Sequence, residues 1–309
     1  MKIALFGTPD FAVQIFNGFL QQSYDIALVV TQPDKRSTRS KILLPPPMKV
    51  FADQNQIPCL QPANWTDTHF WDVYNQIAPD ICLVLAYGLF IPARLLSLPR
   101  LGFVNLHASL LPRYRGAAPV QWALIHGDKQ TGLTTFFLTR EMDAGDILQQ
   151  EVIPIAEDNT AVDIFQKMIQ PGFRLLLKTV ELLEQDRVEP YPQDTHLVSF
   201  APKLSKSMGQ INWQWPSDKI YNLWRGLTPW PGCYSYFEFK GQKKKIQFNQ
   251  ISKTQMDILQ PGQIEVKDRN IIVGTGDRAL QIEYLAVEGK KSVQSCEFLN
   301  GYHVSCFTS

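Results

Sequence analysis

Residues 103–119 read Phe-Val-Asn-Leu-His-Ala-Ser-Leu-Leu-Pro-Arg-Tyr-Arg-Gly-Ala-Ala-Pro, an apolar strand that runs into a loop rich in functional groups. Asn105 and His107 lie two residues apart, so their side chains share one face of an extended chain. Val104 and Leu106 take the other face. Because burying an unpaired carboxamide or imidazole costs free energy, packing alone gives no reason to place both on one face. The stretch therefore predicts chemistry at the end of a strand.

The segments before this stretch predict a Rossmann-like α/β domain with a mostly parallel sheet. Residues 2–6 form an apolar run, a turn follows, and apolar side chains then recur at helical spacing to residue 20. Residues 81–86 are apolar throughout, as expected of a strand covered on both faces. The first turn, at residues 7–10, lacks the G-x-G-x-x-G pattern, so we expect no nicotinamide or flavin site there.

A long helix is expected at residues 160–184, with Pro171-Gly172 in its middle, which should kink or split it. A second helix is expected at 66–77, capped by Asn64 or Thr66. The other elements expected in this domain are strands at 26–31, 59–61, 131–137 and 149–155 and helices at 49–56 and 120–126.

The pattern changes near residue 186. Residues 186–204 are rich in Pro and polar side chains, as in a linker. Short alternating strands with turn signals then follow, which indicate a small, OB-like β-barrel. We therefore expect a catalytic domain at 1–185, a linker at 186–206 and a barrel at 207–309. Four tryptophans crowd the start of the barrel and are expected to be core residues rather than base-stacking platforms: Trp213, Trp215, Trp224 and Trp230.

Length and composition suit two soluble domains, since the chain has 309 residues of which 45% are hydrophobic. No window of 18 apolar residues occurs, and the N-terminus opens directly into a strand, so we expect a cytoplasmic protein that does not enter a membrane. The five cysteines are odd in number and contain no C-x-x-C pair, so neither a disulfide nor a metal site is expected. Cys82 lies in an apolar run and should be buried.

The net charge of +1 is unevenly divided. Residues 201–309 hold 14 Lys and Arg against 9 Asp and Glu, which suits a phosphate backbone but is also common on surfaces without a partner. The connection at 32–47 carries four basic residues against one acidic residue, and it is much longer than an ordinary α/β connection. Such a segment is either functional or disordered, and its composition leaves both open.

The string Asn105-Leu-His-Ala-Ser-Leu-Leu-Pro-x-x-Arg-Gly116 resembles the signature of the folate-dependent formyltransferases. Its continuation, Gly-Ala-Ala-Pro-Val-Gln-Trp122, is similar to the members of that family that formylate methionyl-tRNA. The resemblance implies formyl transfer from the co-substrate 10-formyltetrahydrofolate to initiator methionyl-tRNA, by a monomer and without a metal. It also implies that the basic connection enters the acceptor-stem end of the tRNA and that the barrel holds the tRNA.

The resemblance also assigns roles to residues. It implies that Asn105, His107 and Asp143 are catalytic: the Asn105 amide donates to the developing oxyanion, and Asp143 orients His107. Without the resemblance, Asp143 and Asp146 read as turn residues that bond their own backbone, and residues 87–92 equally as an ordinary turn. The implied folate-binding residues are Ser109, Leu110, Leu111, Pro112, Tyr87, Gly88 and Ile91, and the implied tRNA-binding residues are Arg36, Arg39, Lys41, Lys203 and Lys206.

Two other functions remain open at this level. Formyl transfer to a small amine, such as glycinamide ribonucleotide or an amino sugar, would use the same three catalytic residues without a basic connection or a barrel for tRNA. A tRNA-binding protein without activity would need neither Asn105 nor His107. The joint presence of the catalytic residues and the basic segments favours formylation of a tRNA.

Overall fold

The computed structural model describes residues 1–36, 42–254 and 259–308. The chain divides into two compact units, which are considered separately. Unit 1 contains residues 1–119, 131–154 and 165–201, and unit 2 contains residues 120–130, 155–164 and 202–309.

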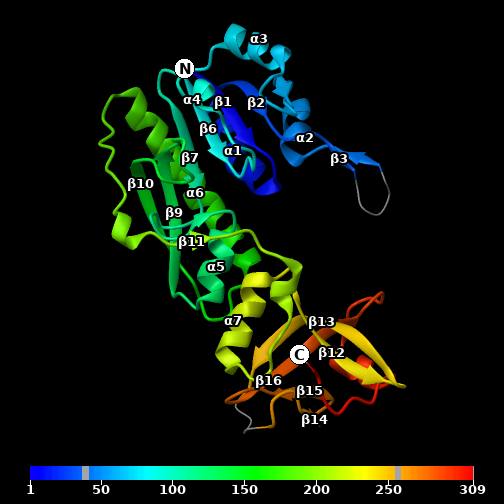
Figure 1. Ribbon diagram of the computed structural model, residues 1–309. Helices are drawn as coiled ribbons and strands as arrows, with labels where there is room; N and C mark the ends of the chain where they lie inside the picture. Colours follow the sequence, from blue (N-terminus) through cyan, green and yellow to red (C-terminus); the bar gives the residue numbers. More distant parts are fainter. Residues whose placement is uncertain (37–41, 255–258, 309) are drawn as a thin grey trace. The chain divides into compact units, whose positions relative to one another are not determined.

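Unit 1 is built on a seven-stranded sheet in the order β10-β9-β7-β6-β1-β2-β5 (Figure 1). The five strands from β7 to β5 are parallel, and β9 is antiparallel to β7. The mostly parallel, Rossmann-like sheet expected from the sequence is thus confirmed. The strands are β1 (Lys2–Gly7), β2 (Asp25–Val30), β5 (Cys59–Leu60), β6 (Ile81–Leu85), β7 (Phe103–His107), β9 (Gln130–Phe137) and β10 (Ile147–Pro154).

Helices cover both faces of this sheet. On one face, α1 (Asp10–Gln21) meets α6 (Ala161–Glu184), where the rings of Phe19 and Phe173 lie 5.5 Å apart. On the other face, α3 (Thr68–Ile77) contributes to a buried cluster with Val84 and Phe103, and α4 (Ala93–Leu96) adds its own apolar side chains. Val84 is the register partner of Asn105. Asn105 and His107 therefore lie on the α3 and α4 face, beyond Phe103.

The structure corrects two details of the helices. α6 is one helix of 24 residues, so of the two effects expected of Pro171, a kink or a split, the split does not occur. A Cβ on Gly172 would lie 3.0 Å from Ile15 and 3.2 Å from Leu106, which shows that this residue lets the helix approach α1 and β7 closely. The cap of α3 is Asp67, rather than Asn64 or Thr66, because the Asp67 carboxylate accepts hydrogen bonds from the first turn.

Small elements complete unit 1. In the basic connection, β3 (Lys35–Arg36) pairs antiparallel with β4 (Leu43–Leu44), and this pair projects from the sheet in Figure 1; α2 (Pro47–Gln54) follows it. After α6, the chain forms the 3-10 helix Thr195–Leu197 and then β11 (Phe200–Ala201), which pairs in parallel with β8 (Arg115–Gly116).

Unit 2 contains an antiparallel sheet in the order β12-β13-β16-β15-β14, with β17 beside β16. Isolated bridges from Tyr236 to Thr308 and from Gln263 to Cys306 carry the hydrogen bonding from β12 through the chain's end to β14. The small barrel expected from the sequence is thus confirmed, as an antiparallel sheet whose edges are bridged by the end of the chain. The elements are α5 (Pro119–Ile125), the 3-10 helix Lys206–Gly209, α7 (Ser217–Leu227), β12 (Cys233–Phe239), β13 (Gln242–Lys253), β14 (Ile264–Lys267), β15 (Asn270–Gly274), β16 (Ala279–Val287), β17 (Val293–Gln294) and α8 (Ser295–Leu299).

The tryptophans of unit 2 have different environments. Trp213 and Trp224 are buried, as expected, and the Trp213 indole N–H donates to the Ser235 hydroxyl at 3.0 Å. Trp215 is half-buried. The expectation of a core position is wrong for Trp230, which is 52% exposed because it lies in the turn between α7 and β12.

The five cysteines are free thiols, and Cys82 is fully buried, as expected. Burial raises the pKa of the Cys82 thiol, so it stays protonated at neutral pH. Across the described residues, no helix combines the length and apolar character needed to cross a bilayer.

We expect Gly226→Ala, in α7, to destabilise unit 2. Alanine is the better helix former by about 1 kcal/mol, but its Cβ would lie 2.6 Å from Ile125 and 2.7 Å from the Gln121 carbonyl of α5. Overpacking of this kind costs about 1–3 kcal/mol, so thermal denaturation should show a lower melting temperature. Gly301→Ala is the control, because its Cβ would have no neighbour closer than 4.0 Å. A Gly226→Ala variant more stable than wild type would contradict the close packing of α5 and α7.

Candidate active site

Strand β7 carries two of the three predicted catalytic residues. Asn105 pairs with Val84 of β6 and with Phe136 of β9, and His107 pairs with Thr134. Asn105 is half-buried, and none of the described residues forms a hydrogen bond with its carboxamide. His107 is 7% exposed. A half-buried amide without a partner is available to donate to a ligand.

Among the described residues, one hydrogen bond holds the imidazole of His107. Its Nε2 lies 2.9 Å from the backbone carbonyl of Tyr114. Because a carbonyl only accepts, Nε2 must carry a hydrogen in both the neutral and the protonated ring. Nδ1 is therefore the nitrogen that gains or loses a proton, and it faces the Asp143 carboxylate at 3.8 Å.

Asp143 lies in the connection between β9 and β10, and its backbone has a φ of 52°. Its Oδ2 accepts a hydrogen bond of 2.8 Å from the Gly116 amide, and its carboxylate is 12% exposed. Asp146, three residues further on, is exposed. The structure thus brings Asp143, and not Asp146, to His107.

Two side chains that the sequence did not mark, those of Ser199 and Gln193, support these residues. Tyr114 holds His107, and its own amide donates to the Ser199 hydroxyl at 3.0 Å. Gln193 is buried and donates to the backbone carbonyls of Asp143 and Gly145, both at 2.8 Å. Ser199 and Gln193 were expected in a linker, where no sequence signal distinguishes a supporting side chain from an exposed one.

The predicted folate loop, Ser109–Pro112, is held in place from β9 and β10. The Thr134 hydroxyl donates to the Ser109 carbonyl at 2.7 Å and accepts from the Leu111 amide at 3.1 Å. The Gln150 amide donates to the Leu111 carbonyl at 2.9 Å. Leu111 is buried against Phe136, whereas Leu110 and Pro112 are half-buried.

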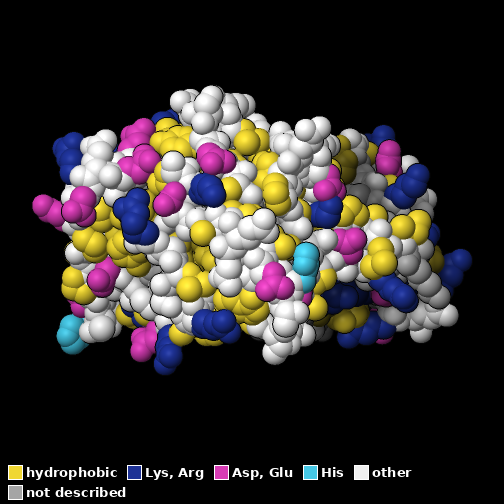
Figure 2. Space-filling view, turned by 90° about the horizontal axis from the view of Figure 1, so that it is seen from above, with side chains coloured by type: hydrophobic (Ala, Val, Ile, Leu, Met, Phe, Trp, Pro, Cys, Tyr) yellow, Lys and Arg dark blue, Asp and Glu magenta, His cyan; other side chains and the backbone are white. Residues whose placement is uncertain are grey.

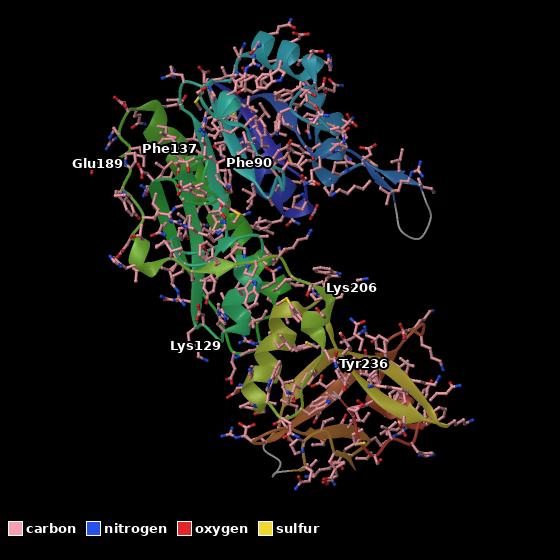
Figure 3. All side chains as sticks on the ribbon, viewed as in Figure 1. Phe90, Lys129, Phe137, Glu189, Lys206 and Tyr236 are labelled. Atoms are coloured by element: carbon pink, nitrogen blue, oxygen red, sulfur yellow. The ribbon has the colours of Figure 1, made fainter. Side chains whose placement is uncertain are left out.

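The second predicted folate loop follows β6, beside β7. Tyr87 and Ile91 are buried in the cluster under α3 and α4, and Gly88 has a positive φ of 77°. The Tyr87 carbonyl accepts from Thr8 and Gln32, which ties together the chain beyond the ends of β1, β2 and β6. Leu89 and Phe90 are exposed, and Figure 3 labels Phe90 in this loop. The loop therefore presents apolar surface next to the β7 site.

The predicted tRNA-binding residues are distributed over both units. Arg36, in β3, and Lys203 and Lys206, which precede α7, are exposed, and Figure 3 labels Lys206. Arg39 and Lys41 lie outside the described residues. On the face shown in Figure 2, basic side chains are interspersed with acidic ones. That face alone does not single out a tRNA-binding surface.

Within the described part of the chain, no three His, Cys, Asp or Glu side chains lie together as a metal site would require. The site brings together an amide donor at Asn105, an imidazole at His107 and a carboxylate at Asp143. Together they can bind a developing negative charge and move a proton.

Known proteins resemble this chain over almost its whole length. Residues 1–180 match the family model described as formyl transferase, and residues 203–303 match the model of the formyl transferase C-terminal domain. The methionyl-tRNA formyltransferase of Halalkalibacterium halodurans is 39% identical, over 97% of this chain and 95% of that protein. The methionyl-tRNA formyltransferase of Thermodesulfovibrio yellowstonii is also 39% identical, over 98% and 96%.

Solved structures share the fold at low identity. HypX from Aquifex aeolicus in complex with tetrahydrofolic acid superposes with a TM-score of 0.67 at 15% identity, over all of this chain and half of that one. WlaRD, a sugar 3N-formyl transferase, has a TM-score of 0.68 at 18% identity, over 94% of this chain and 99% of that one. From the family models and the full-length relatives, we conclude that the chain belongs to the formyl transferase family, among its methionyl-tRNA formyltransferases.

Proposed function

We propose that the chain transfers the formyl group of 10-formyltetrahydrofolate to the α-amino group of initiator methionyl-tRNA. The observation that carries the catalytic assignment is the geometry of His107, whose Nε2 is held by the Tyr114 carbonyl and whose Nδ1 faces Asp143 at 3.8 Å. Relatives at 39% identity over almost the whole chain support the choice of substrates. A cytoplasmic location and a monomeric state stay predictions.

The chemistry requires two forms of stabilisation. As the amine attacks the formyl carbon, negative charge develops on the formyl oxygen and positive charge on the incoming nitrogen. The Asn105 amide, which the described residues leave unpaired, donates to that oxygen. A single donor of this kind contributes about 2.7–4 kcal/mol to transition-state stabilisation in comparable sites. His107 adds a second donor through Nδ1 when this nitrogen is protonated.

The proton of the incoming amine needs an acceptor. A free α-amine has a pKa near 7.7–8.0, and the neighbouring ester lowers it further, so a large fraction is neutral at cellular pH. No strong base is then required to generate the nucleophile. The Asp143 carboxylate orients His107 and accepts the proton that the amine releases during attack, through a water molecule.

The folate would lie against two loops at the carboxyl ends of β6 and β7, where open α/β sheets bind ligands. The segment Ser109–Pro112 offers a wall fixed by Thr134 and Gln150. The loop after β6 offers exposed apolar side chains, with Phe90 66% exposed and Leu89 42% exposed. Apolar surface of this kind suits a flat heterocycle.

The decisive experiment is a formyl-transfer assay with purified protein, 10-formyltetrahydrofolate and three acceptors: methionyl-tRNA, glycinamide ribonucleotide and an amino sugar. We expect transfer to methionyl-tRNA alone. Transfer to either small amine in preference to the tRNA would overturn the substrate assignment. Transfer to none of the three acceptors would overturn the assignment of formyltransferase activity.

Asp143→Asn should lower kcat by about 10²- to 10⁴-fold, the range for loss of a general acid or base. KM for both substrates should change little, because the carboxylate acts during attack. Asp146→Asn is the matched control, since it makes the same change on an exposed aspartate of the same connection. Steady-state kinetics with both variants checks the assignment, which fails if the two variants lose the same activity.

Arg39→Ala should raise KM or lower kcat for the tRNA and leave folate binding intact, because a cation that contacts phosphate contributes to tRNA binding alone. The salt dependence of tRNA binding should also weaken, by about one unit of the log–log slope. Arg100→Ala is the control, an exposed arginine that precedes β7 and so lies at the opposite end of that strand from His107. Equal losses for folate and tRNA would contradict the role of this segment.

A further inference from the structure

Gln193 lies outside the helices and strands, yet its buried side chain is fully hydrogen-bonded. It lies after α6 and before β11, and its side chain is 8% exposed. Its Nε2 donates to the carbonyls of Asp143 and Gly145, both at 2.8 Å. Its Oε1 accepts from Nε and Nη2 of Arg115, at 3.0 and 2.7 Å. Every hydrogen-bonding group of the carboxamide is therefore used, as a buried amide requires.

The chemistry of its partners fixes the orientation of this carboxamide. A flipped amide would place its oxygen against two backbone carbonyls and its NH₂ against a guanidinium, so that no bond could form. The positive charge of Arg115 polarises the amide and strengthens the bonds that it donates. The Gln193 side chain thus connects the Arg115 guanidinium, in one orientation, to the turn that contains Asp143 and Gly145 (the Asp143 turn).

This link closes a ring of contacts around Asp143. Gln193 connects the Arg115 side chain to the Asp143 carbonyl, and the amide of Gly116, the next residue after Arg115, donates to Asp143 Oδ2 at 2.8 Å. Asp143 is therefore held at its backbone by one contact and at its carboxylate by another. Its left-handed backbone, with a φ of 52°, persists only when the surrounding structure holds it.

Strand β11 fixes the position of Gly116, the residue that donates to the Asp143 carboxylate. Gly116 has a φ of 124°, and a Cβ there would lie 2.7 Å from the Ala201 carbonyl, so β8 and β11 pair closely only with glycine at this position. The Arg115 amide donates to the Ser199 carbonyl at 2.9 Å. The segment from Gln193 to Ala201 therefore supports both ends of the contact between Gly116 and Asp143.

We propose that Gln193 is a positioning residue for Asp143, which sets the distance and direction of its carboxylate relative to His107. The proposal rests on the proposed function, in which Asp143 acts on the proton of the amine. Gln193 touches neither His107 nor the reacting atoms, so its effect passes through the Asp143 turn. Losing its amide leaves the Asp143 and Gly145 carbonyls without a donor and frees the turn to shift.

The test is a double-mutant cycle of Gln193→Met and Asp143→Asn in the full-length chain, with methionyl-tRNA and 10-formyltetrahydrofolate as substrates. Methionine keeps most of the side-chain volume and removes all four hydrogen bonds. We expect Gln193→Met to lower kcat by about 10- to 100-fold, the effect of a misplacement of about 1 Å, with KM for both substrates unchanged. In the Asp143→Asn background, measured in single turnovers, the same substitution should lower the rate by less than about 2-fold.

Two further variants keep the test decisive. Gln185→Met makes the same change on an exposed glutamine between α6 and Gln193, whose carboxamide accepts a hydrogen bond from Arg187, and it should leave kcat unchanged. Gln193→Asn keeps a polar amide but withdraws it from the carbonyls, so it takes the place of Gln193→Met if that variant does not fold. Thermal denaturation shows which variant retains the wild-type fold.

The outcomes separate this proposal from the proposed function. Normal kcat in a folded Gln193 variant, or an equal loss in both backgrounds, overturns the positioning role. Full activity of Asp143→Asn overturns the catalytic role of Asp143, and the positioning role of Gln193 with it, whereas an inactive wild type overturns the proposed function itself. A loss in kcat that disappears in the Asp143→Asn background supports the proposal.

Discussion

The hydrogen bond from His107 Nε2 to the Tyr114 carbonyl is the constraint on which the rest of the site depends. Because a carbonyl cannot donate, this bond assigns the hydrogen of Nε2 and leaves Nδ1 as the only nitrogen of the ring that exchanges a proton. It also turns Nδ1 toward Asp143. An imidazole without this anchor could rotate or adopt the other tautomer, and its relation to the carboxylate would then be lost.

The anchor is in turn held by a distant part of the chain. Tyr114 donates to the Ser199 hydroxyl, and β8 pairs with β11 just beyond it. The same segment carries Gln193, which holds the Asp143 turn from the opposite side. One stretch of nine residues, from Gln193 to Ala201, thus supports both partners of the His107 and Asp143 contact; it contains the 3-10 helix Thr195–Leu197 and the two-residue strand β11. A preorganised contact of this kind needs no rearrangement when charge develops.

The sheet positions the side chains of Asn105 and His107. Strand β7 is buried between β6 and β9, with α6 on one face and the cluster under α3 and α4 on the other. The alternation of side chains places Val104 and Leu106 against α6 and places Asn105 and His107 beyond Phe103, where the apolar cluster ends. Packing on both faces of β7 thereby fixes the positions of the Asn105 and His107 side chains, which must be held rigidly and still be able to contact a ligand.

The sequence by itself determined the longer strands of both sheets and the common face of Asn105 and His107, because these follow from local periodicity of two or 3.6 residues. It did not reveal the two-residue strands β3, β4, β8, β11 and β17, which are too short to carry a periodic pattern. Its resemblance to a family also assigned a function to the basic connection at 32–47 and predicted a set of catalytic residues. Only the tertiary structure decided which proton position of His107 is free, that Gln193 and Ser199 belong to the site, and that α6 continues through Pro171. Gln193 and Ser199 bond partners 50 and 85 positions away in the chain, whereas the bond from His107 to Tyr114 spans seven positions and depends on how the intervening loop folds. Hydrogen bonds between residues 50 or more positions apart leave no local pattern, whereas the burial of alternate side chains does.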